Sequence, residues 1–248
     1  MHRVKHLRKD EQQIEPLFDG AFTENKPIGF PNKNGTNAYS NIFYWAHLVA
    51  HETAEFPLHP HEGFEIMTFV FKGTVEHYDT ASKVYTPLKV GDVQAIQAGS
   101  GVSHSERITK GTELFQIWFD PDFSKTMSQD ATYKDYTAES FKVTSDRAKE
   151  RLVYVGENGV VDSITEGLEI EKVTFQNGAF DEILDPAFTY SYYLLDGEIQ
   201  VNEDRVVKDD FYVLQDAPSV RLEVKKTAEL FVIKTLTKVP YSCFIERY

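Results

Sequence analysis

Several features that would place this chain in a common class are missing from its sequence. It has a single cysteine, Cys243, so no internal disulfide can form, and it contains no apolar run of about 18 residues that could span a membrane. The N-terminus, MHRVKHLRKDEQQ, is basic but lacks the apolar segment of a secretory signal. We therefore expect a cytoplasmic protein that does not insert into membranes.

An excess of positive charge is also absent. The chain has 26 Lys and Arg against 39 Asp and Glu, a net charge of -13, which argues against direct binding to nucleic acid because phosphates must be neutralised by basic side chains. The basic run from Arg3 to Lys9 is typical of a solvated tail or face. The acidic clusters Glu203-Asp204 and Asp209-Asp210 are typical of solvated turns.

Aromatic residues are plentiful, and they favour β-sheet over a helix bundle. They make up 13% of the 248 residues, which is enough chain for one large β domain or two domains of about 120 residues each. After residue 150, short strand patterns alternate with turn residues, and YLLDGEIQVNE resembles FVFKGTVEHYD in the first half, so the second half is expected to repeat the first. Residues 120–150 are polar and predict a connection with a short helix.

The residues with metal-binding chemistry lie between His59 and Glu106. Side chains on a β-strand alternate between its two faces, so His59 and His61 point the same way, and so do His104 and Glu106. If the two strands lie side by side in a barrel with these faces inward, three imidazoles and one carboxylate converge on one point. Such a set suits a first-row transition metal and leaves positions open for water or substrate.

Histidine is absent from the second half of the chain. All eight histidines lie at positions 2, 6, 47, 51, 59, 61, 77 and 104. His47 and His51 are expected to take no part in metal binding, because isolated histidines are usually core or surface residues. We therefore expect one transition-metal ion per chain, held by the first half.

This segment resembles the N-terminal metal-binding motif of pirins, a family of two-barrel cupins that includes quercetin-dioxygenase-like proteins. The resemblance runs through HPHEGFE, the strand that ends at Gly73, EHYD, GDVQ and AGSGVSHSE, and ELFQIWFDP resembles the pirin strand that carries a glutamine, here Gln116. It implies an all-β bicupin with two jelly-roll barrels in tandem. The N-terminal metal-binding cupin domain is expected at 1–133, and a degenerate cupin domain at 134–248.

The resemblance implies that His59, His61, His104 and Glu106 bind iron as Fe²⁺, with nickel, copper, zinc and manganese as alternatives. In many other cupins a glutamate four residues after the second histidine, here Glu65, is the ligand. Pirin-like sequences place the carboxylate after the third histidine, so we rank Glu106 first and expect Glu65 to have a supporting or structural role.

The function implied is that of a dioxygenase that opens the ring of quercetin or a related flavonol. Its partners would be a small aromatic substrate and dioxygen, and Glu106 would accept a proton from the substrate hydroxyl as well as bind the metal. The alternative is an iron-dependent redox sensor that acts as a transcriptional co-regulator through a protein partner. A monomer is expected in either case.

Overall fold

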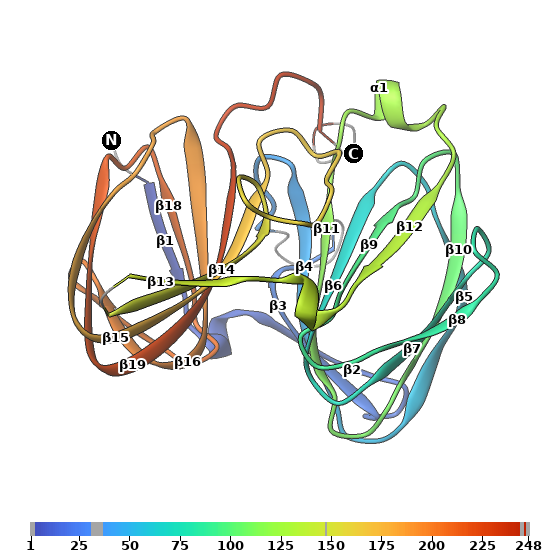
Figure 1. The fold of residues 1–248 in the computed structure, drawn as a ribbon, viewed down its shortest axis with the longest axis horizontal. Helices are drawn as coiled ribbons and strands as arrows, with labels where there is room; N and C mark the ends of the chain where they lie inside the picture. The colour runs from blue at the N-terminus through green and yellow to red at the C-terminus, as the bar shows by residue number, and fades with distance from the viewer. Residues whose placement is uncertain (1–2, 31–36, 147, 244–245, 247–248) are drawn as a thin grey trace. The chain divides into compact units, whose positions relative to one another are not determined.

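A computed structural model describes residues 3–30, 37–146, 148–243 and 246, and β-strands dominate them, as predicted. The chain forms two compact units (Figure 1). The N-terminal barrel consists of Gln13–Ser140, Ser163–Thr165 and Tyr241–Tyr248. The C-terminal barrel consists of Met1–Gln12, Phe141–Asp162 and Glu166–Pro240. No helix among the described residues is long and apolar enough to cross a membrane.

The N-terminal barrel is built from two antiparallel sheets. One has seven strands in the order β12-β9-β6-β11-β4-β3-β2, and the other has four in the order β5-β10-β7-β8. The strands are β2 (Gln13–Leu17), β3 (Phe22–Ile28), β4 (Ile42–Ala50), β5 (Ala54–His61), β6 (Glu65–Lys72), β7 (Val75–Asp79), β8 (Tyr85–Leu88), β9 (Val93–Gln97), β10 (Val102–Ile108), β11 (Glu113–Phe119) and β12 (Thr132–Tyr136).

The strands in the middle of the larger sheet are buried on both faces. The first six residues of β6 are buried, as its continuous apolar sequence predicts for a strand between a filled lumen and an outer layer. The strand stops at Gly73, which has φ +73°, and a Cβ atom there would lie 2.2 Å from the Thr112 hydroxyl. Only glycine fits this turn without strain.

The connection after β11 contains the predicted short helix, α1 (Phe123–Thr126), which the Asp122 side chain caps. Strand β12 follows it and pairs with β9 in the N-terminal barrel, from Thr132↔Gln97 to Tyr136↔Val93. The division expected between residues 133 and 134 therefore falls inside a strand. The N-terminal unit continues through the 3₁₀ helix η2 (Ala138–Ser140).

The C-terminal barrel has one sheet of eight strands in the order β1-β18-β16-β19-β15-β14-β13, with β17 paired to β16. Its strands are β1 (Arg3–Leu7), β13 (Val143–Asp146), β14 (Lys149–Val155), β15 (Glu169–Ile183), β16 (Phe188–Val201), β17 (Asp204–Val207), β18 (Phe211–Gln215) and β19 (Ser219–Leu236). β19 lies between β15 and β16 and pairs with both along most of its length. In the N-terminal barrel two shorter strands are arranged in the same way: β10 lies between β5 and β7, and β11 lies between β4 and β6.

The basic N-terminal run contains a strand with a solvated face: Arg3–Leu7 forms β1 and pairs with β18 (Figure 1), while Lys5, Arg8 and Lys9 are exposed. The expectation of solvated turns holds for Glu203 and Asp204 but was wrong for the second acidic cluster. Asp209 and Asp210 are buried at 6% and 2% exposure rather than solvated. Lys9 donates to Asp209 at 2.6 Å, and His6 Nε2 lies 3.2 Å from Asp210, so the N-terminal segment supplies polar partners for both buried carboxylates.

Candidate metal centre

The predicted metal segment folds as two neighbouring strands. β5 and β10 pair antiparallel, and His104 lies directly opposite His59. The register then shifts between His104 and Glu106, because β5 contains one extra residue. On its other side β10 pairs regularly with β7, which places Glu106 opposite His77.

The three predicted imidazoles come together. His59, His61 and His104 each offer a nitrogen that lies within 4.8 Å of the others. His61 Nε2 and His104 Nε2 are 2.9 Å apart, and the ring centroids of His59 and His104 are 4.3 Å apart. Glu106 groups instead with His104 and His77 within the same 4.8 Å limit. His104 thus belongs to both groups.

Burial keeps the central imidazoles neutral. Desolvation and the neighbouring His104 and His59 rings lower the pKa of His61 to about 3. Desolvation, followed by the effect of His59 and His77, lowers the pKa of His104 to about 2. A neutral imidazole has a nitrogen lone pair, so both side chains are ready to bind a metal ion at physiological pH.

The hydrogen bonds of His59 and His104 orient their rings. His59 Nδ1 donates to the Pro57 carbonyl at 2.8 Å, which leaves Nε2 with its lone pair. His104 Nδ1 lies 2.9 Å from His77 Nε2, so its Nε2 is the nitrogen that faces His61. His77 is itself stacked on Tyr133 with the rings 5.0 Å apart.

The role of His77 was missed by the sequence analysis, which included this residue only in the pirin-like EHYD motif. Its side chain is fully buried between Tyr133 and His104, and burial lowers its pKa. The available signal was its position two residues before Asp79 on a strand, which puts both side chains on one face, and the structure buries that face. His77 thus contacts His104 and lies close enough to Glu106 to belong to the same possible metal-binding group.

A hydrogen-bond chain holds Glu106. Gln116 Nε2 donates to both Glu106 oxygens at 3.0 Å, and Trp118 Nε1 donates to Gln116 Oε1 at 3.1 Å. The indole N–H can only donate, so it fixes the amide with its NH₂ group toward the carboxylate. The glutamine noted in the sequence therefore positions the only carboxylate in either imidazole group.

Trp118 is supported from behind by a buried polar cluster. Its ring stacks on Tyr44 at 4.5 Å, and the Tyr44 hydroxyl donates to Glu24 at 3.1 Å. Lys26 pairs with Glu24 at 2.7 Å and with Glu15 at the same distance. Desolvation raises the pKa of Glu24, and the Lys26 ammonium and the Tyr44 hydroxyl offset only part of this rise.

Glu65, the alternative carboxylate, has a different set of partners. It is fully buried and accepts hydrogen bonds from Ser163 Oγ at 2.6 Å, Thr165 Oγ1 at 2.7 Å and the Ile164 backbone N–H at 3.1 Å. These bonds attach the segment Ser163–Thr165 to β6. The geometry gives Glu65 a structural role, while the ligand set of His59, His61, His104 and Glu106 stays a prediction.

The other histidines with described structure lie outside both groups. His47 packs edge-on against Phe115, and His51 Nε2 lies 2.8 Å from the Thr23 hydroxyl. His6 lies on β1 in the C-terminal barrel, which therefore contains an imidazole despite lacking histidine in its main part. Among the described residues, the C-terminal barrel contains no group of three or more metal-binding side chains.

An apolar pocket of about 510 Å³ opens beside His61. The centroid of the Trp118 ring lies 4.9 Å from that of the His61 ring. The Phe64 ring stacks on the Trp118 ring with centroids 6.2 Å apart. The lining residues are Phe30, Pro60, His61, Glu62, Phe64, Trp118, Phe123 and Met127. A flat aromatic molecule could pack here with one edge toward the imidazoles.

The donor set fits a transition-metal ion. When two nitrogens bind the same ion at about 2.1 Å and the two metal–nitrogen bonds form a right angle, the nitrogens lie about 3 Å apart. The 2.9 Å between His61 Nε2 and His104 Nε2 is close to this separation. Imidazole nitrogens with one carboxylate favour iron, nickel, copper, manganese or zinc over calcium or magnesium.

Comparison with known proteins gives the same assignment. Residues 31–119 match the Pirin family. The predicted resemblance to the pirin family is confirmed. A relative from Escherichia coli K12 named quercetin 2,3-dioxygenase is 44% identical over 71 residues, which cover 27% of this chain and 30% of that protein. A Pasteurella multocida protein provisionally given the same name is 28% identical over 185 residues, 71% of this chain and 75% of its own.

Solved pirin structures share the fold. The crystal structure of the bacterial pirin YhhW from Escherichia coli, in complex with nickel(II), superposes with a TM-score of 0.79 at 18% identity and covers 95% of this chain and 100% of that one. An oxalate decarboxylase from Bacillus subtilis superposes with a TM-score of 0.67 at 10% identity, over 93% of this chain and 75% of that one. The predicted bicupin architecture, with two tandem cupin barrels, is confirmed.

Proposed function

We propose that this pirin is a metal-dependent dioxygenase that opens an electron-rich aromatic ring, with quercetin as the substrate to test first. The observation that carries the proposal is a cluster of three imidazoles, one of which, His61, lines a pocket together with Trp118 and Phe64. The names of its relatives support the same chemistry.

In this proposal His59, His61, His104 and Glu106 hold one Fe²⁺ ion. When bound, the ion would act as a Lewis acid toward a substrate hydroxyl and bring dioxygen next to the electron-rich ring. Nickel supports the same role in principle, because the donor set does not select between these metals.

The protein's own residues would bind the ring and move one proton. Trp118 and Phe64, stacked on each other with ring centroids 6.2 Å apart, provide an aromatic surface for the ring, and Phe30 packs edge-on to Trp118 at 5.8 Å. Glu106 is the base that takes the hydroxyl proton, and Gln116 keeps both of its oxygens in place. The apolar walls would keep bulk water away from the reacting ring.

The test is turnover by the full chain after removal of all metal and reconstitution with Fe²⁺ or Ni²⁺. Loss of flavonol absorbance together with release of carbon monoxide, abolished by a chelator and restored by the metal, supports the dioxygenase. Bound metal without turnover of any flavonol contradicts it. A surface that changes between the ferrous and ferric forms, measured by hydrogen exchange, would then favour the redox sensor with a protein partner.

A further inference from the structure

The interior of the C-terminal barrel carries charged side chains where a core would be apolar. Lys234 on β19 pairs with Tyr190 on β16 and with Glu169 on β15, and residues paired across a sheet share a face. The next row along these strands places Glu171 beside Val232 and Tyr192. Val232 and Tyr192 belong to the buried core of this barrel, so the charged residues on the same strands also face inward.

Two further strands contribute to this inward charge. Lys149 and Arg151 on β14 lie opposite Phe175 and Val173, which are both core residues. Glu182 lies opposite Val220 near the end of β15. Alternation would predict apolar residues at every one of these positions, and departures from such a pattern concentrate at functional sites.

These side chains surround a cavity of about 190 Å³, roughly the volume of six water molecules in the liquid. Its floor is apolar and consists of core residues such as Leu222, Leu230 and Val232. Its charged lining consists of Lys149, Arg151, Lys234, Glu171 and Glu182. The cavity therefore combines an apolar base with three cations and two carboxylates.

The lysines are half-buried and already paired. The Lys149 side chain is 17% exposed and lies 2.5 Å from Glu182, while Lys234 is 22% exposed and lies 2.5 Å from Glu169. Arg151 is paired more loosely, because its nitrogens lie 3.3 Å from Glu171 and 3.8 Å from Glu182. A guanidinium has five N–H donors in a fixed fork, so Arg151 can bind a further carboxylate through two parallel hydrogen bonds.

Tyr190 adds a neutral donor to the same cavity. Its hydroxyl oxygen accepts a hydrogen bond from the Asp185 backbone N–H at 2.9 Å, which leaves its own hydrogen to donate. The Lys234 ammonium lies 5.6 Å from the centre of the Tyr190 ring. A carboxylate between Arg151 and Tyr190 would thus meet donors from two strands.

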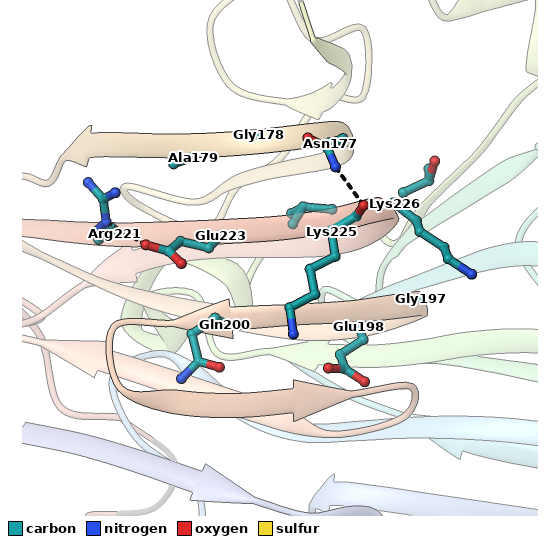
Figure 2. Close-up of a pocket in the computed structure, with 12 residues that line it drawn as sticks. Asn177, Gly178, Ala179, Gly197, Glu198, Gln200, Arg221, Glu223, Lys225 and Lys226 are labelled. Atoms are coloured by element: carbon teal, nitrogen blue, oxygen red, sulfur yellow. Dashed lines mark hydrogen bonds and ion pairs between the residues drawn. The ribbon is translucent and has the colours of Figure 1, made fainter.

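A larger groove of about 910 Å³ on the same barrel has a different character (Figure 2). It lies on the outer face of the sheet, because Arg221, Glu223 and Lys225 are exposed while the residues between them are buried. Asn177 Nδ2 donates to the Lys225 carbonyl at 2.6 Å and so links β15 to β19 where their register shifts. This groove is lined from the outer face of the sheet, whereas the core residues Leu222 and Leu230 line the interior cavity.

We propose that the interior cavity of the C-terminal barrel binds a small organic monocarboxylate with a short aromatic or aliphatic body. The body packs on Leu222 and Leu230, and the carboxylate binds Arg151 and Tyr190. Arg151, the most loosely paired of the three cations, supplies the charge that selects an anion over an amine. This site does not depend on the metal or on the proposed dioxygenase activity.

The test uses benzoate as the probe and the full chain after removal of metal. To exclude binding at the imidazole cluster, calorimetry is repeated with the His104→Ala variant. We expect saturable binding of one benzoate per chain in both proteins. Chemical shifts of ¹³C-labelled tyrosines should change at Tyr190 and Tyr192 and not at Tyr44.

Two variants locate the site. Arg151→Gln should weaken benzoate binding at least about tenfold, since a charge-assisted hydrogen bond is lost. Tyr190→Phe should weaken it severalfold and serves as the second test if Arg151→Gln fails to fold. Arg205→Gln, an exposed residue paired with Glu198 on β16 and β17, is the matched control and should leave the affinity unchanged. No saturable binding, unaltered binding in both cavity variants, or tighter binding of benzylamine than of benzoate would overturn the proposal.

Discussion

The two barrels have related strand pairing but opposite interior chemistry. In the N-terminal barrel the inward positions of β5 and β10 are occupied by imidazoles and Glu106. In the C-terminal barrel the corresponding ends of β15 and β19 carry Phe180, Val220 and Leu222, which pack in the apolar core. Its charge lies further along the strands and consists of Lys, Arg and Glu. A shared fold thus leaves the chemistry of each lumen to a handful of inward side chains.

The largest expected effect is the loss of metal on His104→Ala. His104 contributes to both imidazole groups, so its removal leaves neither group complete. Metal affinity should fall by more than about 100-fold, the upper range for a change in a mere supporting residue. Circular dichroism should be unchanged, because the fold is stabilised mainly by apolar burial.

The matched control is His51→Ala, whose side chain contacts Thr23 away from the cluster. Its metal content should equal that of the parent chain, at about one transition-metal ion per molecule by elemental analysis. A second ion that persists in His104→Ala would place a metal site outside the N-terminal cluster. This would contradict the contrast between a metal-binding and a metal-free barrel.

Replacing Glu106 should affect metal binding, whereas replacing Glu65 should affect the stability of the fold. Glu106→Gln should abolish turnover and weaken metal binding with little change in stability. Glu65→Gln should keep the metal but destabilise the fold by about 1–3 kcal/mol, because an amide cannot accept all the hydrogen bonds that Ser163, Ile164 and Thr165 donate. Urea unfolding measured beside metal titration separates the two. Greater metal loss in Glu65→Gln than in Glu106→Gln would make Glu65 the ligand.

The acid sensitivity of the metal-free chain should reside in the N-terminal barrel. The pKa values of His61 and His104 in the folded state, about 3 and about 2, lie well below the unfolded value near 6.5. Between these values the unfolded state binds more protons, so stability falls as the pH is lowered from about 6.5 toward 3. From pH 7 to 5 each imidazole should remove about 2 kcal/mol.

Hydrogen exchange at both pH values gives the measurement. Protection of β5 and β10 should decrease at pH 5 more than protection of β15 and β19. The double variant His61→Ala/His104→Ala should remove most of the difference. Equal loss of protection in both barrels, or no change in the double variant, would show that other groups control the response.

The smallest effect is expected from Trp118→Phe. Phenylalanine keeps an aromatic wall but cannot donate to Gln116 Oε1, so the amide is free to turn its oxygen toward Glu106. We expect metal affinity to fall severalfold, and Gln116→Ala to have the same effect or a larger one. A titration with Ni²⁺ measures both variants, and Tyr78→Phe, on the neighbouring β7, is the control. Unchanged metal affinity in Gln116→Ala would show that the hydrogen bonds from Trp118 through Gln116 do not position Glu106.

The sequence alone determined what depends on neighbouring residues along one strand. Because alternate side chains on a strand share a face, the spacing of His59 and His61 and the pirin-like motif around His104 predicted the imidazole cluster, and Gly73 predicted the end of β6. The tertiary structure alone decided which distant strands meet. It placed β1 against β18 beside Asp209 and Asp210, and it joined Glu65 to Ser163–Thr165, about 100 residues away. It also gathered Lys149, Glu171 and Lys234 around one cavity. Such contacts cannot be predicted from local patterns, because they depend on how the whole sheet closes and on whether a buried charge finds its partner there.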